Sequence, residues 1–217
     1  MRIRWYGQSA FLLTGTSRVF IDPFGDPGGA LAARGIEWNY PRIAESADLL
    51  LVTHEHMDHN EVDVIGGEPV VIRSTAGRFE SPVGEVVGIA SEHDDVAGTL
   101  RGPNTIFRFE LDGVRFAHLG DFGQAALRPE QRDAIGDVDV LFVPAGGGPT
   151  VGGQPAADVV RAIAPRLVVP MHYRTPAISF LDPPDEFLAA LGMPVTETES
   201  DVEIDGLEGV LLLAPPS

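Results

Sequence analysis

Short apolar runs alternate with polar, glycine-containing turns along the first part of the chain. Strand-like runs cover Ile3–Tyr6, Ala10–Leu13 and Arg18–Ile21, and each is short with β-branched or aromatic residues. The turns GQS and TGTS separate these runs, so the pattern predicts an antiparallel meander. The segment DPFGDPGG, which starts at Asp22, has the residues of a loop and ends the meander.

Further strands are predicted in the middle and the second half of the chain. They cover Asp48–Val52, 68–72, 84–90, Thr105–Leu111, Val114–His118, Asp139–Val143 and Leu167–Pro170. The first of them reads DLLLV, a nearly continuous apolar run that is typical of a strand buried on both faces. Asp112-Gly113 separates two of the runs and is a strong signal for a β-hairpin.

Helices are fewer and lie mainly in the second half. The predicted helices are Pro129–Ile135, Pro155–Ile163 and Pro184–Leu191, and each starts near a proline, which suits a first helical turn. No linker, shift in composition or repeat marks a boundary between domains. We therefore expect one α/β domain over residues 1–217, with many strands and with helices packed outside.

Composition narrows the chemistry. The chain has no cysteine, which excludes disulfides, cysteine-ligated zinc and thiol nucleophiles, so any transition metal must be held by His, Asp or Glu. The net charge of −17 repels phosphate backbones and anionic lipid. We expect a small-molecule substrate and neither a nucleic acid nor a membrane as partner, and a homo-oligomer stays open. No signal-peptide core and no apolar run near 18 residues is present, so we expect a cytoplasmic protein.

The histidines have a distinctive distribution. All six lie at or just past the end of a strand-like run, at positions 54, 56, 59, 93, 118 and 172. Loops at strand ends are where α/β proteins assemble their sites. Three of the six are crowded into THEHMDHN, directly after the buried strand DLLLV. His118 lies at the end of its strand, where a structural residue is the more common case, and a supporting role behind the site stays open.

The spacing in THEHMDHN suits metal binding. In an extended segment, side chains two positions apart face the same way, so His54, His56 and Asp58 share a side. Asn60 favours a helix start, and a turn at 58–60 would swing Asp58 and His59 towards a second position. Zinc takes imidazole nitrogens and carboxylate oxygens at ~2.0–2.2 Å. One segment would then supply two ligands to each of two metals.

The ordered motifs of the chain resemble those of the metallo-β-lactamase-like hydrolase superfamily. The resemblance is to its broad metal-dependent hydrolase branch, which includes ascorbate phosphate lactonase-like proteins, and it covers nearly the whole chain. Its motifs are VFIDP, THEHMDHN, SEHDDVAG with RGPN, HLGDFG, DVLFVPAGG and VVPMHYRT. It implies an αββα four-layer sandwich, two mixed β-sheets flanked by helices, with the site along one edge of the sheets.

The resemblance also implies roles for individual residues. His54, His56 and His93 would hold one metal, and Asp58, His59 and His172 would hold the second. Asp121 would bridge both metals, and Asp22 would pin the histidine loop. Two zinc ions are implied, although the same donors accept manganese or iron.

The reaction class that follows is hydrolysis. Two divalent ions with Asp58 and Asp121 keep a positive centre, which lowers the pKa of water. A metal-bound hydroxide would attack an ester, lactone, amide or phosphodiester of a small molecule, with Asp58 and Asp121 as catalytic residues. Arg101, Asn104, Tyr173 and Arg174 flank the ligand segments, and whether they and His118 contribute stays open.

Three alternatives compete with this interpretation. An iron-dependent oxidoreductase could use the same scaffold, and a non-catalytic metal-binding domain could use the same ligands. A nuclease is disfavoured by the negative charge and by the missing accessory domain. Loops 24–40, 73–82, 145–155 and 174–184 are expected to form the pocket walls. The loop AGGGPTVGGQPA departs from the family in its glycine content, so the substrate cannot be inferred by analogy.

Overall fold

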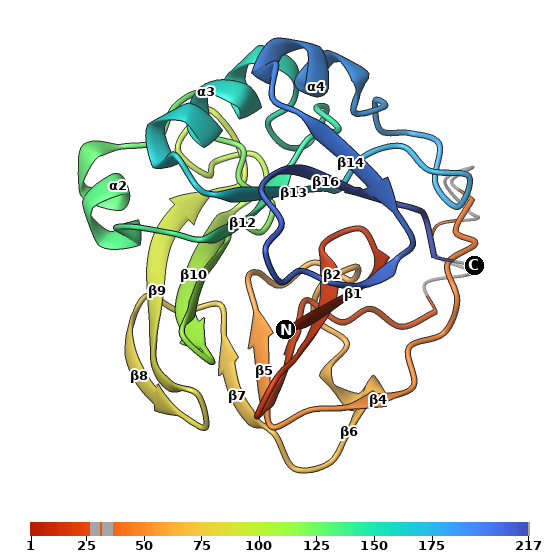
Figure 1. The fold of residues 1–217 in the computed structure, drawn as a ribbon, viewed down its shortest axis with the longest axis vertical. Helices are drawn as coiled ribbons and strands as arrows, with labels where there is room; N and C mark the ends of the chain where they lie inside the picture. Colours follow the sequence, from red (N-terminus) through yellow and green to blue (C-terminus); the bar gives the residue numbers. More distant parts are fainter. Residues whose placement is uncertain (27–30, 32–36, 217) are drawn as a thin grey trace.

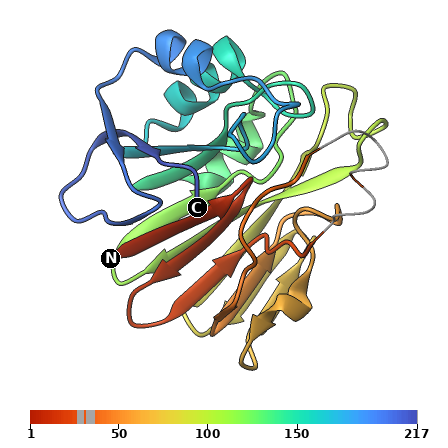
Figure 2. The same cartoon turned by 90° about the vertical axis from the view of Figure 1, so that its right-hand side faces the viewer.

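Two mixed β-sheets face each other and enclose most of the apolar side chains (Figures 1 and 2). The computed structural model describes residues 1–26, 31 and 37–216. Asp22 to Asp26 begin the predicted DPFGDPGG loop as irregular chain, and the rest of that loop lies outside the described residues. This arrangement is the α/β layered class that the motifs predicted.

The first sheet has six strands and contains the predicted meander. Its order is β15 (Asp201–Glu203), β1 (Arg2–Gly7), β2 (Ala10–Thr14), β3 (Arg18–Ile21), β5 (Leu49–Val52) and β7 (Val70–Arg73). β1, β2 and β3 pair antiparallel, whereas β3, β5 and β7 pair parallel. The carboxyl ends of β1, β3 and β5 therefore lie at the same edge of this sheet.

The second sheet has eight strands. Its order is β14 (Val195–Thr198), β16 (Gly209–Leu213), β13 (Leu167–Met171), β12 (Val140–Pro144), β11 (Val114–His118), β10 (Pro103–Leu111), β9 (Gly84–Glu92) and β8 (Gly77–Ser81). The half from β14 to β11 is parallel, and the half from β11 to β8 is antiparallel. β9, β11 and β13 consequently run in the same direction and end at the same edge.

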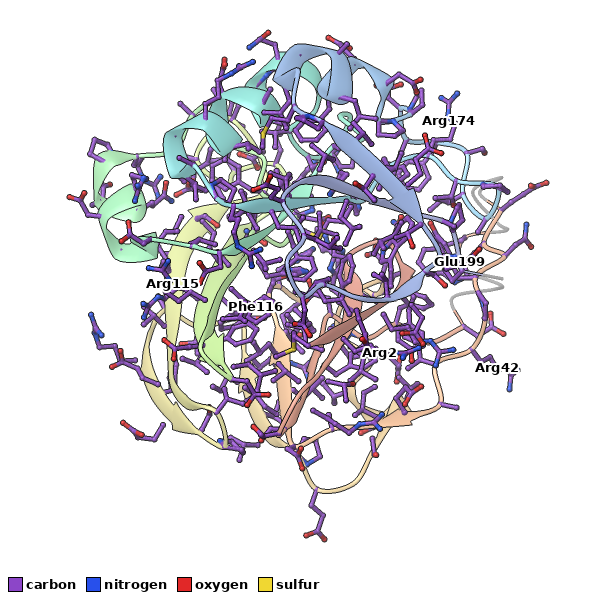
Figure 3. All side chains as sticks on the ribbon, viewed as in Figure 1. Arg2, Arg42, Arg115, Phe116, Arg174 and Glu199 are labelled. Atoms are coloured by element: carbon purple, nitrogen blue, oxygen red, sulfur yellow. The ribbon has the colours of Figure 1, made fainter. Side chains whose placement is uncertain are left out.

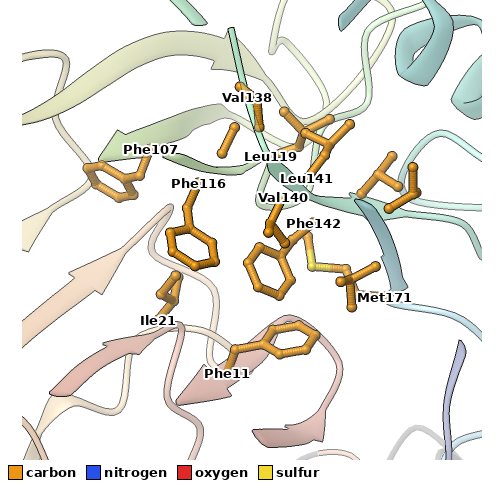
Figure 4. Packing of buried hydrophobic residues seen from close by; sticks show 14 of the residues in the cluster. Phe11, Ile21, Phe107, Phe116, Leu119, Val138, Val140, Leu141, Phe142 and Met171 are labelled. Carbon is orange, nitrogen blue, oxygen red and sulfur yellow. The ribbon is translucent and has the colours of Figure 1, made fainter. Parts of the chain in front are cut away.

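The core between the sheets follows the two-residue period of the strands. In β2, Phe11 and Leu13 point inwards, whereas Leu12 belongs to a second cluster on the outer face. Figure 4 shows Phe11 facing Phe142 of the opposite sheet, and the ring centroids lie 4.5 Å apart. Burying an aromatic side chain of this size stabilises the fold by about 2–3 kcal/mol. Figure 3 shows Phe116 inside the molecule, while charged side chains such as Arg42 and Arg174 project outwards.

Helices cover the outer face of the eight-stranded sheet (Figures 1 and 2). They are α2 (Pro129–Ile135), α3 (Gly153–Ile163) and α4 (Asp185–Leu191). All three predicted helices are confirmed, with α3 beginning two residues earlier than expected. Among the residues that the structure describes, irregular segments cover the outer face of the six-stranded sheet. They include Tyr40 and Ile43, and the small sheet β4 (Glu45–Ser46) with β6 (Ile65–Gly66) lies beside them.

Two local predictions were wrong. Segment 73–82 was expected to be a loop of the pocket, but it contains β8. Asn60 was expected to start a helix, but the short 3-10 helix η1 (Val62–Val64) begins two residues later. The side-chain amide of Asn60 instead donates a hydrogen bond to Glu55 at 3.2 Å. Over the part of the chain that the structure describes, every helix is too short or too polar to span a bilayer.

Candidate metal centre

The seven predicted ligands converge at the edge of the two sheets that is formed by the carboxyl ends of β5, β9, β11 and β13. Each ligand lies at or beyond the carboxyl end of β5, β9, β11 or β13. The structure brings together three overlapping sets of donor atoms, each within 4.8 Å of one another. The sets are His54, His56 and His93; His54, His59 and Asp121; and Asp58, His59 and His172. The first and third sets are those that the motifs predicted for two separate metals.

Asp121 lies between the two predicted sets and contacts both. Its Oδ2 is 3.1 Å from Nε2 of His93 and 3.2 Å from Nε2 of His172. Its Oδ1 is 3.4 Å from Nε2 of His59. The backbone N–H of Asp121 donates to Oδ1 of Asn104 at 3.0 Å, which fixes the position of the carboxylate. The carboxylate of Asp121 therefore lies within reach of His93 in the first predicted set and of His59 and His172 in the second.

The histidine rings are oriented from behind. His59 Nδ1 lies 3.0 Å from Oδ2 of Asp22, and His93 Nδ1 lies 3.1 Å from the carbonyl oxygen of Pro149. His54 Nδ1 lies 3.0 Å from the hydroxyl of Thr53. Hydrogen bonds of this kind on one ring nitrogen leave the other nitrogen free as a metal ligand. The predicted pinning role of Asp22 is consistent with its contacts to both Thr53 and His59.

One buried atom supports the fit of these donors to a metal. Nε2 of His59 is buried and has no hydrogen-bond partner among the described residues, although it lies 3.5 Å from Asp58 and 3.4 Å from Asp121. A buried polar atom without a partner is costly, and a cation bound between these carboxylates would satisfy it. The chemistry of the set, imidazole nitrogen and carboxylate oxygen without thiolate, suits zinc, manganese or iron.

The protonation states also suit cation binding. Burial lowers the pKa of His54, His56 and His172, so these rings are neutral, as metal ligands must be. Burial opposes the charge of His59, yet Asp121, Asp58 and Asp22 raise the pKa of that ring well above its usual value. His172 and His59 hold the pKa of Asp121 well below its usual range despite burial. The carboxylates of Asp22, Asp58 and Asp121 thus stabilise a positive charge at the position of His59.

Glycines let the backbone close around the ligands. Gly120 has φ +56°, and a Cβ there would lie 2.4 Å from Oδ1 of Asn104. Gly146 packs against His172, where a Cβ would lie 2.3 Å from the His172 carbonyl oxygen. His172 itself has φ 50°, a left-handed conformation that is uncommon outside glycine. One glycine of the 145–156 loop, Gly146, therefore has a structural cause, the close approach of its backbone to the predicted ligand His172.

A cavity of about 940 Å³ opens over the centre. The predicted ligands on its wall are His56, Asp58, His93, Asp121 and His172. Three of the four loops predicted to form its walls contribute, through Leu31 and Trp38, Gly148 and Pro149, and Phe180. Segment 73–82 does not reach it, and the 94–102 loop contributes Leu100 and Arg101 instead.

Of the residues whose role the sequence left open, some lie at the site and others have partners away from it. Arg101 lines the cavity, whereas Asn104 lies beneath Asp121. Tyr173 is buried and donates to the carbonyl of Leu213, and Arg174 donates to the carbonyl of Leu181. Both therefore have structural partners away from the cavity.

His118, whose contribution the sequence left open, contacts the turn after β1 and the backbone of Gly120. Its Nε2 lies 3.0 Å from the carbonyl of Ser9, and its Nδ1 accepts from the backbone N–H of Gly120 at 3.1 Å. Both ring nitrogens are thus occupied, which leaves none for a metal.

Two site residues, Gln8 and Ser9, were not predicted. They form the turn after β1, where Ser9 Oγ donates to Asp121 at 3.2 Å and Gln8 Nε2 donates to Asp58 at 3.4 Å. The carbonyl of Gln8 also accepts from the backbone N–H of His172 at 3.2 Å, which ties the two sheets together at the site. The only signal in the sequence is a glycine-containing turn, and such turns are common.

Residues 2–172 match the family model described as the beta-lactamase superfamily domain. The chain belongs to the beta-lactamase superfamily. The match ends at His172, so it includes all seven predicted ligands. The fold class and the family predicted from the motifs are both confirmed.

Named relatives within the beta-lactamase superfamily agree on the class of activity. A UPF0173 metal-dependent hydrolase of Thermococcus kodakarensis is 32% identical and aligns over 88% of this chain and 92% of its own. A protein of the same name from Thermococcus onnurineus is 30% identical with the same coverage. The chain is accordingly a metal-dependent hydrolase of this superfamily.

Solved structures support the same fold. A Thermotoga maritima protein, assigned to the Zn-dependent hydrolases of the metallo-beta-lactamase superfamily, has a TM-score of 0.78 and 27% identity, covering 99% of this chain and 98% of its own. An isothiocyanate hydrolase from Delia radicum gut bacteria has a TM-score of 0.69 and 13% identity, covering 100% and 97%. At that identity the second likeness concerns the fold alone.

Proposed function

We propose that the protein is a dinuclear zinc hydrolase that cleaves an ester, lactone, amide or phosphodiester of a small molecule. The observation that carries the proposal is the position of Asp121, whose carboxylate contacts His93 of one predicted donor set and His59 and His172 of the other. His54, His56 and His93 would hold one ion, and Asp58, His59 and His172 would hold the other. The Thermotoga maritima likeness, assigned to Zn-dependent hydrolases, supports zinc as the metal.

The bound ions would supply Lewis acidity, which lowers the pKa of water and stabilises negative charge on the oxygen of the scissile group. The residues of the chain position the donor sets and the attacking water. Asp121 holds the two donor sets at a fixed separation, and Asn104 and Ser9 hold Asp121. Asp58 lies on the cavity wall, where its carboxylate can accept a hydrogen bond from the attacking water and orient it. The buried rear of the centre limits the approach of substrate to the cavity side.

The test is hydrolysis by zinc-loaded protein of a panel of lactones, aryl esters and phosphodiesters such as bis(4-nitrophenyl) phosphate. Treatment with a chelator should abolish turnover, and added zinc should restore it. Asp121→Ala should abolish turnover as well. Asp137→Ala serves as the matched control, since the Asp137 side chain is 84% exposed and, among the described residues, pairs with Arg115 alone. Full activity after metal removal, or in Asp121→Ala, would overturn the proposal.

The same samples separate the alternatives. Iron rather than zinc in the purified protein, with oxygen consumption instead of hydrolysis, would favour an oxidoreductase on this scaffold. Bound metal without turnover of any substrate class would favour a metal-binding domain. The names of the relatives support hydrolysis over both.

A further inference from the structure

The mouth of the cavity is apolar on several sides. Met57, Leu100 and Phe180 line it and are 46%, 77% and 48% exposed. They are three of only seven large hydrophobic side chains that are exposed among the described residues. Trp38 lies on the same wall. Clustered exposed apolar side chains around a polar centre indicate a ligand with an apolar body.

Arg101 is the single Lys or Arg among the described residues that line this cavity. Its guanidinium has no hydrogen bond or ion pair with any residue that the structure describes, whereas nearly all other described arginines have one. Glu55 lines the cavity too, but its carboxylate is bound by Arg73 at 2.6 and 2.8 Å and by Ser74 at 2.6 Å. The charge of Glu55 is thus compensated, and that of Arg101 is not.

The loop that carries Arg101 is held in shape before any ligand binds. Asp94 follows the predicted ligand His93, and its carboxylate accepts four backbone N–H groups at 2.7–3.0 Å. Two of these groups belong to Leu100 and Arg101. Asp94, next to a predicted metal ligand, therefore fixes the backbone of the loop. As a result, Leu100 and Arg101 lie next to each other on the cavity wall. Such pre-organisation reduces the entropy lost on binding.

We propose that the substrate carries a carboxylate on an apolar body, and that Arg101 binds this carboxylate while the scissile group lies at the centre. The inference rests on the proposed hydrolase function and adds its substrate class. A planar guanidinium pairs with a carboxylate through two parallel hydrogen bonds. One guanidinium neutralises one such charge. A more highly charged phosphate would keep excess negative charge in the field of a chain with net charge −17.

A matched pair of probes tests the recognition without requiring turnover. 4-Phenylbutanoate and 4-phenylbutanamide share an apolar body and differ in charge, and their binding to zinc-loaded protein can be measured by NMR titration. The wild type should prefer the carboxylate by about tenfold, the usual scale for one charge-assisted pair. Arg101→Gln should remove the part of the preference that zinc does not supply and leave amide binding unchanged. Arg78→Gln, which removes a 71% exposed arginine outside the cavity, should retain the whole preference.

Zinc also attracts carboxylates, so the measurement is repeated on metal-free protein. The preference should persist there and should disappear in Arg101→Gln. The proposal is overturned if the metal-free wild type shows no preference, or if metal-free Arg101→Gln retains it. A preference that depends on Arg101 in a protein that hydrolyses nothing would leave the recognition standing and refute the hydrolase function alone.

Discussion

The carboxylate of Asp22 lies 3.0 Å from Nδ1 of His59, and both side chains are fully buried. The same carboxylate accepts from the backbone N–H and the hydroxyl of Thr53, each at 2.7 Å. It therefore fixes the ring orientation of one predicted ligand and the start of the loop that carries three others. Asp22, which follows β3, thus positions Thr53 and His59, which follow β5.

Asp22→Asn should weaken zinc binding about 10- to 100-fold, the usual effect of losing the partner that orients a ligand histidine. Asparagine tolerates the left-handed backbone at this position, where φ is 52°, so the loop should keep its conformation. Competition with a chromophoric chelator measures the affinity. Asp112→Asn is the control, because Asp112 has the same φ but binds Thr16 on the surface. Equal affinity in wild type and Asp22→Asn would show that His59 needs no such orientation.

Gly120→Ala should destabilise the fold by about 2 kcal/mol or more and weaken zinc binding. The added Cβ would meet Asn104 Oδ1 at 2.4 Å and Thr53 Cβ at 2.7 Å, and Asn104 holds the backbone of Asp121. Gly113→Ala is the control, since Gly113 also has positive φ but has open space around it. It should cost only the backbone strain, about 1 kcal/mol. Urea unfolding of both variants makes the comparison, and equal losses would contradict the packing argument.

The free energy of unfolding should decrease as the pH is lowered through the range in which His118 becomes protonated. Burial lowers the pKa of His118 to about 4, against an unfolded value near 6.5. The unfolded chain binds the proton more readily, so the contribution is complete above pH 6.5 and is lost as pH falls towards 4. Between pH 7 and pH 4.5 the free energy of unfolding should drop by about 2–3 kcal/mol more in wild type than in His118→Gln. Both are measured with chelator present, so that the other histidines contribute alike; parallel pH profiles would refute the prediction.

The convergence of the predicted ligands could be anticipated because their signals in the sequence are local. His54, His56, Asp58 and His59 lie within one short motif, and the remaining ligands each follow a recognisable strand. The supports of these ligands were less accessible to sequence reasoning. Gln8 depends on a left-handed backbone with φ 48°, which no composition rule assigns to glutamine. Asp94 has its role only because a loop curls back so that four N–H groups meet one carboxylate.

Three of the strands that the sequence analysis missed share a physical reason. β8, β14 and β15 each lie at an edge of a sheet, where one side is unpaired and apolar periodicity is weak. β8 reads GRFES and β15 reads DVE, so neither has a continuous apolar face. β16 is different, because GVLLL is apolar throughout but too short to distinguish a buried strand from a helix segment. Pairing with β13 and β14 on either side makes this segment a strand.

The central claim is that Asp121 joins two metal ions in one centre. The most direct measurement is the metal content of purified protein after zinc loading and removal of free ions, by elemental analysis of wild type and Asp121→Ala. Two zinc ions per chain are expected in the wild type, and one or none in the variant. One ion per chain in the wild type, or two ions retained by folded Asp121→Ala, would contradict the claim.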